Sequence, residues 1–98
     1  MKKNTKYNKA YIESEAIASA KQGRITEDLG RFILERCEEI SNFAFVTNGN
    51  EELRQSLIDD AVMRVCLKFL GYYKEGKSAA NLIISMIYST MTNKIVSL

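Results

Sequence analysis

The sequence contains no histidine, no proline and no tryptophan, and it has only two cysteines among its 98 residues. Without histidine the chain has no imidazole base, which excludes Ser-His-Asp and Cys-His catalysis. Cys37 and Cys66 are too few for a structural zinc site and too far apart for a Cys-x-x-Cys motif. Since it also has no nucleophile–base pair, metal-ligand cluster or glycine-rich phosphate loop, we expect a protein that is not an enzyme and has no metal or cofactor.

Long apolar runs are missing as well. No stretch approaches the roughly 18 consecutive apolar residues of a membrane span, so we expect no membrane partner. The first residues, MKKNTKYNKAYIESEAIA, carry charge but no apolar centre, so they are not a signal peptide. These features predict a cytoplasmic protein whose thiols are reduced.

The composition indicates a single folded domain. A chain of 98 residues has the usual length of one domain, and 46% hydrophobic residues is too high for intrinsic disorder. Because proline is absent, glycine is the main breaker of regular structure, and Gly23, Gly49, Gly71 and Gly76 fall between apolar-periodic segments.

The apolar periodicity predicts an all-α domain. We expect a mobile basic tail over residues 1–7, followed by four helices at about 8–22, 27–45, 51–70 and 79–96. An Asn-Gly turn at 46–50 separates the middle two helices. The expected N-caps are Asn8, Thr26, Asn50 and Ser78, and the first and third helices end at Gly23 and Gly71.

The third and fourth helices carry the strongest apolar patterns. In the third, the stripe runs through Leu53, Leu57, Ile58, Ala61, Val62, Val65, Cys66, Phe69 and Leu70. In the fourth, apolar residues from Leu82 to Tyr88 wrap more than one face, and the helical period and length favour a helix over a strand there. Surface of this kind needs a cover, which a homodimer through the last helix could supply.

The net charge of +2 conceals a division along the chain. Residues 1–24 carry six positive and two negative charges, residues 25–62 carry three and nine, and residues 63–98 carry five and one. Two interpretations remain open: a set of solvated helix surfaces, or an acidic face for a protein partner and a basic face for nucleic acid.

Two short segments are candidate sites. Asp59 and Asp60 point about 100° apart on a helix, so they suit an exposed acidic contact better than a shared proton. The connector at 72–77 joins two tyrosines to Lys74 and Lys77, with Lys68 one turn earlier. Aromatic rings beside cations bind single-stranded nucleic acid, but tyrosines at helix ends are also common half-buried anchors.

From Leu53 onward the features follow a specific order. A helix, LRQSLIDDAVMRVCLKFL, is followed by an aromatic pair, a basic glycine turn and a second helix, KSAANLIISMIYSTMTNKI. This order resembles region 2 of sigma factors, most closely the short late-transcription sigma-like factors of tailed bacteriophages. The likeness covers residues 53–95 well and residues 6–45 loosely.

The resemblance implies a function in transcription initiation in a bacterial host cell. By position, the residues that would bind the clamp helices of the core RNA polymerase largest subunit are Ser56, Asp59, Asp60 and Met63. Those that would contact the DNA of the −10 promoter element are Lys68, Tyr72, Tyr73, Lys74, Lys77, Asn81, Ile84, Ser85, Tyr88 and Lys94.

The sequence also departs from the family pattern. The family's promoter-melting aromatics are mostly replaced, for example by Asn81, Leu82 and Ser85, and the Asn-Pro opening of the last helix is absent. Polymerase binding is therefore better supported than promoter recognition. The alternative functions are a polymerase-binding regulator without promoter recognition and a small helical interaction protein unrelated to sigma factors.

Overall fold

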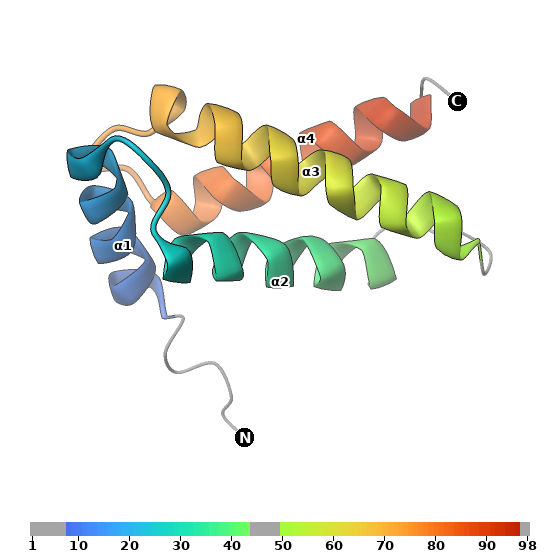
Figure 1. The fold of residues 1–98 in the computed structure, drawn as a ribbon, viewed down its shortest axis with the longest axis horizontal. Coiled ribbons are helices and arrows are strands. Elements are labelled where there is room, and N and C mark those ends of the chain that lie inside the picture. Colours follow the sequence, from blue (N-terminus) through green and yellow to red (C-terminus); the bar gives the residue numbers. More distant parts are fainter. Residues whose placement is uncertain (1–7, 44–49, 97–98) are drawn as a thin grey trace.

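The computed structural model describes residues 8–43 and 50–96 (Figure 1). They form α1 (Lys9–Gln22), α2 (Glu27–Phe43), α3 (Glu51–Tyr72) and α4 (Ala79–Val96), with no strand among them. The predicted all-α, four-helix fold is confirmed. The expected basic tail at 1–7, the last positions of the second helix at 44–45 and the turn at 46–49 lie outside the described residues.

Polar side chains begin all four helices, as the sequence predicts. The first backbone N–H groups of a helix have no carbonyl partner within the helix, and each of these side chains accepts a hydrogen bond from one of them. The bonds run to Asn8 from Tyr11 (2.8 Å), to Thr26 from Leu29 (3.3 Å), to Asn50 from Leu53 (3.0 Å) and to Ser78 from Asn81 (3.2 Å).

The helix ends follow the prediction at one glycine and not at the other. Gly23 adopts the left-handed conformation (φ 82°) and ends α1 by donating its N–H to Ser19. The expected end of the third helix at Gly71 is wrong, because α3 continues through Gly71 to Tyr72. Tyr73 stacks on the fully buried Phe69 and donates its N–H to the Phe69 carbonyl, which holds the last turn in place.

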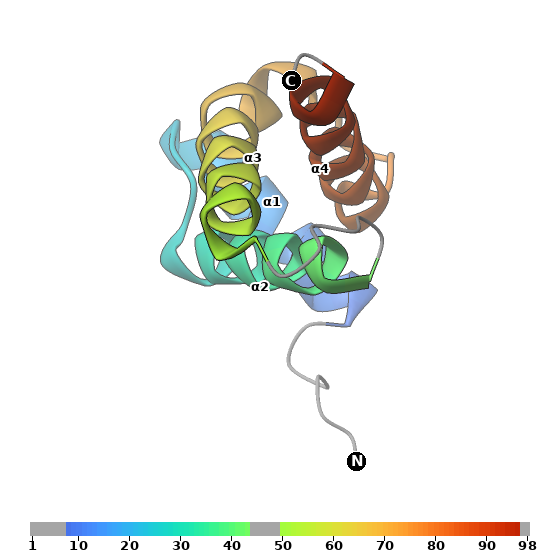
Figure 2. The same ribbon diagram turned by 90° about the vertical axis from the view of Figure 1, so that its right-hand side faces the viewer.

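The helices enclose one core. α3 and α4 run side by side in opposite directions above α2, and α1 lies across the end of the domain where α4 begins (Figures 1 and 2). The buried side chains come from all four helices and include Ile12, Leu29, Ile33, Leu57, Val65, Phe69, Ile83, Ile87 and Met91. None of the four described helices combines the length and apolarity that crossing a bilayer requires.

The apolar wrap of α4 is largely accommodated within the domain. Ile83 and Ile87 are fully buried, and Leu82, Ile84 and Met86 pack against the core. The observation that suggested a homodimer through this helix therefore has an intramolecular explanation.

Candidate functional site

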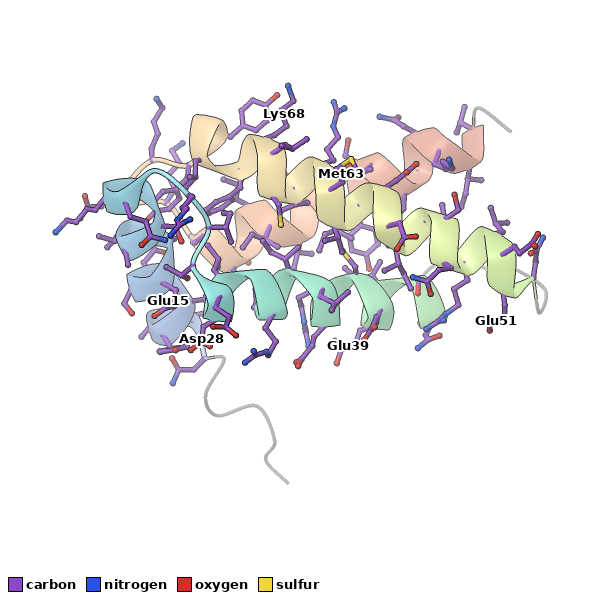
Figure 3. All side chains as sticks on the ribbon, viewed as in Figure 1. Glu15, Asp28, Glu39, Glu51, Met63 and Lys68 are labelled. Atoms are coloured by element: carbon purple, nitrogen blue, oxygen red, sulfur yellow. The ribbon has the colours of Figure 1, made fainter. Side chains whose placement is uncertain are left out.

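The four residues assigned to polymerase contact lie along the solvent side of α3. Ser56 is partly buried, whereas Asp59 and Asp60 are exposed and Met63 is 63% exposed. Figure 3 shows Met63 on the side of α3 that faces away from α2. The structure therefore places these residues on one face of α3, although their side chains have different partners.

The two aspartates have separate partners. Asp59 accepts a hydrogen bond from the Gln55 side chain (2.9 Å) within α3. Asp60 forms an ion pair with Lys94 of α4, with 3.0 Å between carboxylate oxygen and Nζ. A pair at this exposure contributes at most about 1 kcal/mol, so its main effect is to neutralise both charges locally.

This ion pair connects the residues expected to contact polymerase with those expected to contact DNA, which the sequence analysis treated as separate sites. Asp60 belongs to the expected polymerase surface and Lys94 to the expected DNA surface, yet they meet across the α3–α4 contact. At this end of the domain the acidic and basic segments of the chain are neighbours. The acidic contact that remains without an ionic partner in the described structure is Asp59.

Sequence reasoning missed Leu67 and Arg64, which extend this face toward the end of α3. Leu67 is 73% exposed, and Arg64 is exposed without an ion pair or hydrogen bond to any residue of the described segments. A signal was present, because Met63 and Leu67 are four positions apart and both are out of phase with the core stripe of this helix.

An open groove separates the outward sides of α3 and α4. Its volume is about 380 Å³, and its lining is formed by Asp60, Met63, Arg64, Leu67, Lys68, Thr90, Asn93 and Lys94. A second hollow of about 320 Å³ is lined by Arg64, Tyr72, Ser85, Met86, Ser89 and Thr90. Because Arg64 and Thr90 line both, the two hollows adjoin and follow the helix pair. Together they are called the α3–α4 groove below.

The two tyrosines of the connector have different environments. Tyr72 is 60% exposed and lines the second hollow. Tyr73 is half-buried, with its ring stacked on Phe69 at 5.2 Å between centroids and its hydroxyl donating to Glu13 of α1. Burial, and then this hydrogen bond, raise the pKa of Tyr73 to about 12. Tyr73 thus has the geometry of an anchor, and Tyr72 alone offers an open ring.

Glu13 holds the connector from both ends. One carboxylate oxygen accepts the Tyr73 hydroxyl, and the other accepts the Ala79 N–H at 2.9 Å, where α4 begins. A carboxylate at a helix N-terminus is favoured by the helix dipole. Lys74 and Lys77, between these two attachments, are exposed at the tip of the domain.

The remaining residues expected to contact DNA are spread along α4. Asn81, Ser85 and Tyr88 are exposed, while Ile84 packs against the core. The exposed three, at spacings of four and three residues, share one side of α4, and Ser85 lines the second hollow. From Asn81 to Lys94 the set extends about 20 Å along α4 at 1.5 Å per residue.

The cysteines behave as core residues. Cys37 is fully buried and Cys66 partly buried, and both thiols are free. Burial raises the pKa of both thiols, that of Cys37 to about 12 with a further contribution from Cys66. Neither thiol is therefore a thiolate nucleophile near neutral pH. No three acidic or cysteine side chains of the described segments come together as a group that could hold a metal ion.

Comparison with known proteins gives no relative: no protein-family model matches the chain, and neither a curated protein nor a solved structure is significantly similar to it.

Proposed function

We propose that this protein is a sigma-like transcription factor that binds bacterial core RNA polymerase through the outward face of α3. The observation that carries the proposal is the solvent-exposed pair Asp59 and Met63, at positions that correspond to the polymerase-binding helix of sigma region 2. The contact joins an apolar side chain with a carboxylate, which suits the basic coiled-coil helices that the resemblance implies as partner.

The energetic argument concerns Met63. An exposed methionine gains roughly 1.5–3 kcal/mol when a partner buries it fully. Asp59 has no cation beside it in the described structure, so its charge is available to a basic surface without first breaking an ion pair. Asp60 must exchange Lys94 for a new partner, so we expect it to contribute less.

Contact with the −10 promoter element forms the second part of the proposal. It is supported by the exposed Tyr72 and by the exposed cations Lys74 and Lys77 on the connector. The support is narrower than for polymerase, because Tyr72 is the one open aromatic ring of the connector, and melted strands are usually bound by several.

The test is binding of the purified chain to bacterial core polymerase in competition with the host sigma factor. Charge reversal of the carboxylate that has no ion pair in the described structure, Asp59→Lys, is expected to weaken binding at least tenfold, which corresponds to about 1.4 kcal/mol. The matched control is Glu35→Lys on α2, an exposed glutamate with no partner in the described structure, and its affinity should stay within twofold.

Asp60→Lys is less informative on its own, because it places a new lysine against Lys94 and perturbs the helix pair. The double variant Asp60→Lys with Lys94→Asp restores an ion pair with reversed polarity and separates the two effects. The proposal fails if the wild-type chain neither binds core polymerase nor competes with the host factor, or if Asp59→Lys and Glu35→Lys bind equally.

A further inference from the structure

The groove between α3 and α4 combines exposed aliphatic side chains with cations. Met63 and Leu67 expose 63% and 73% of their surface along one wall, and Met86 contributes from α4. Large aliphatic side chains exposed at successive turns of a helix cover a continuous apolar strip. The strip faces away from α2, on the side of α3 where Figure 3 shows Met63 and Lys68.

When the ion pair between Asp60 and Lys94 is set aside, the remaining charged side chains that line the groove are positive. Lys94 is neutralised by Asp60. Arg64 and Lys68 are exposed and have no ion pair or hydrogen bond with the residues that the structure describes. The groove therefore presents two unpaired cations beside an apolar strip, which is the complement of an acidic amphipathic surface.

The dimensions fit a helix. The α3 wall from Asp60 to Tyr72 extends about 18 Å at 1.5 Å per residue, which matches roughly three turns of a docked helix. Amphipathic helices bind such grooves through apolar side chains spaced three and four residues apart, with charged residues at the edges.

Single-stranded nucleic acid matches the groove less well. Base stacking needs flat aromatic surfaces, and Tyr72 is the one aromatic residue among those that line the two hollows. The aliphatic strip would be left against a charged backbone, so it favours a protein ligand.

We propose that the α3–α4 groove is a docking site for an acidic amphipathic helix of a partner protein. Leucine-like side chains of that helix pack on Met63, Leu67 and Met86, and its carboxylates pair with Arg64 and Lys68. The groove shares Met63 with the proposed polymerase contact, whereas Asp59 lies outside it and Arg64 and Lys68 lie outside the polymerase set, so charge reversals at Asp59 and at Arg64 with Lys68 test the two proposals separately.

The test uses three labelled synthetic helices of 18 residues and the full-length chain. The first has leucines on one face and glutamates on the edges, the second has lysines in place of the glutamates, and the third has glutamines in place of the leucines. Fluorescence anisotropy should show tightest binding of the acidic amphipathic peptide, at least tenfold tighter than either variant, and weakening as salt screens the pairs.

Two variants of the chain locate the site. Arg64→Glu with Lys68→Glu should weaken binding of the acidic peptide at least tenfold and restore some affinity for the lysine peptide. The control reverses two exposed cations that do not line the groove, Lys9→Glu with Arg24→Glu, and should change affinity less than twofold. Circular dichroism verifies that both variants keep the wild-type helix content.

Three results would overturn the inference: equal binding of the acidic and basic peptides, loss of affinity in the control as large as in the groove variant, or tighter binding of a 12-nucleotide oligothymidine that Arg64→Glu with Lys68→Glu abolishes. Sedimentation velocity of the chain alone adds a fourth. A dimer that the groove variant dissociates would show that the occupant is a second copy.

Discussion

Substitution of Glu13 tests how the connector between α3 and α4 is held. Its carboxylate accepts the Tyr73 hydroxyl and the N–H of Ala79, a residue with no exposed surface. Glu13→Ala removes both acceptors. A hydrogen bond to a charged group is worth about 1.5–3 kcal/mol, and an unsatisfied buried donor costs about 1–3 kcal/mol.

We expect Glu13→Ala to lower the free energy of unfolding by about 2–4 kcal/mol, because water reaches part of this site and replaces part of the loss. In a domain of about 100 residues, 1 kcal/mol shifts the midpoint by about 5 °C, so the thermal midpoint should fall by roughly 10–20 °C. Circular dichroism at 222 nm during thermal and urea unfolding measures both quantities.

The matched control is Glu35→Ala, the same substitution at an exposed helical position without a partner in the described structure. Its effect should stay within about 0.5 kcal/mol. A double-mutant cycle with Tyr73→Phe should give a coupling energy of about 1 kcal/mol or more. The reasoning is refuted if Glu13→Ala and Glu35→Ala unfold at the same temperature, or if the cycle shows no coupling.

Three further predictions concern pH, glycine and the core. The pKa values of Tyr73 and Cys37 are both raised to about 12. The stability that these two neutral groups contribute is therefore complete below their unfolded pKa values and is lost as pH rises toward 12. Tyr73→Phe should make the urea midpoint fall less steeply with rising pH, and an unchanged fall would contradict the prediction. Gly71→Ala should stabilise the protein by about 0.5–1 kcal/mol, because Gly71 is helical and a Cβ there meets nothing within 4 Å. Gly23→Ala should destabilise it, because the φ of Gly23 is 82°. Equal effects of the two variants in thermal melts would contradict the different backbone conformations of the two glycines. Ile87→Ala should cost about 2–5 kcal/mol in urea unfolding, and a loss below 1 kcal/mol would show that Ile87 is not in a packed core.

Much of the fold could be read from local patterns. The N-caps at Asn8, Thr26, Asn50 and Ser78 all form the expected bonds, because a cap depends on residues within one turn of it. The misplaced end at Gly71 has a nonlocal cause. A glycine usually permits a helix to end, but the stacking of Tyr73 on the buried Phe69 keeps the last turn of α3 helical.

The candidate site was predictable only in part. The exposure of Asp59 and Met63 follows from their position opposite the apolar stripe of α3, which the 3.6-residue period determines. The pairing of Asp60 with Lys94 joins residues 34 positions apart, and no spacing rule indicates which cation an exposed aspartate meets. The same holds for Tyr73 and Glu13, which are 60 positions apart.

The sequence by itself determined the class of this protein: four helices, their starting residues and the sides they bury, since these depend on periodicity and on contacts within a turn. It also determined that catalysis by histidine is absent. Only the tertiary structure decided which charges cancel, which tyrosine is an anchor and where the open groove lies. The packing of α3 against α4 and of α1 across their end sets these features, because they depend on the distance between side chains from different helices.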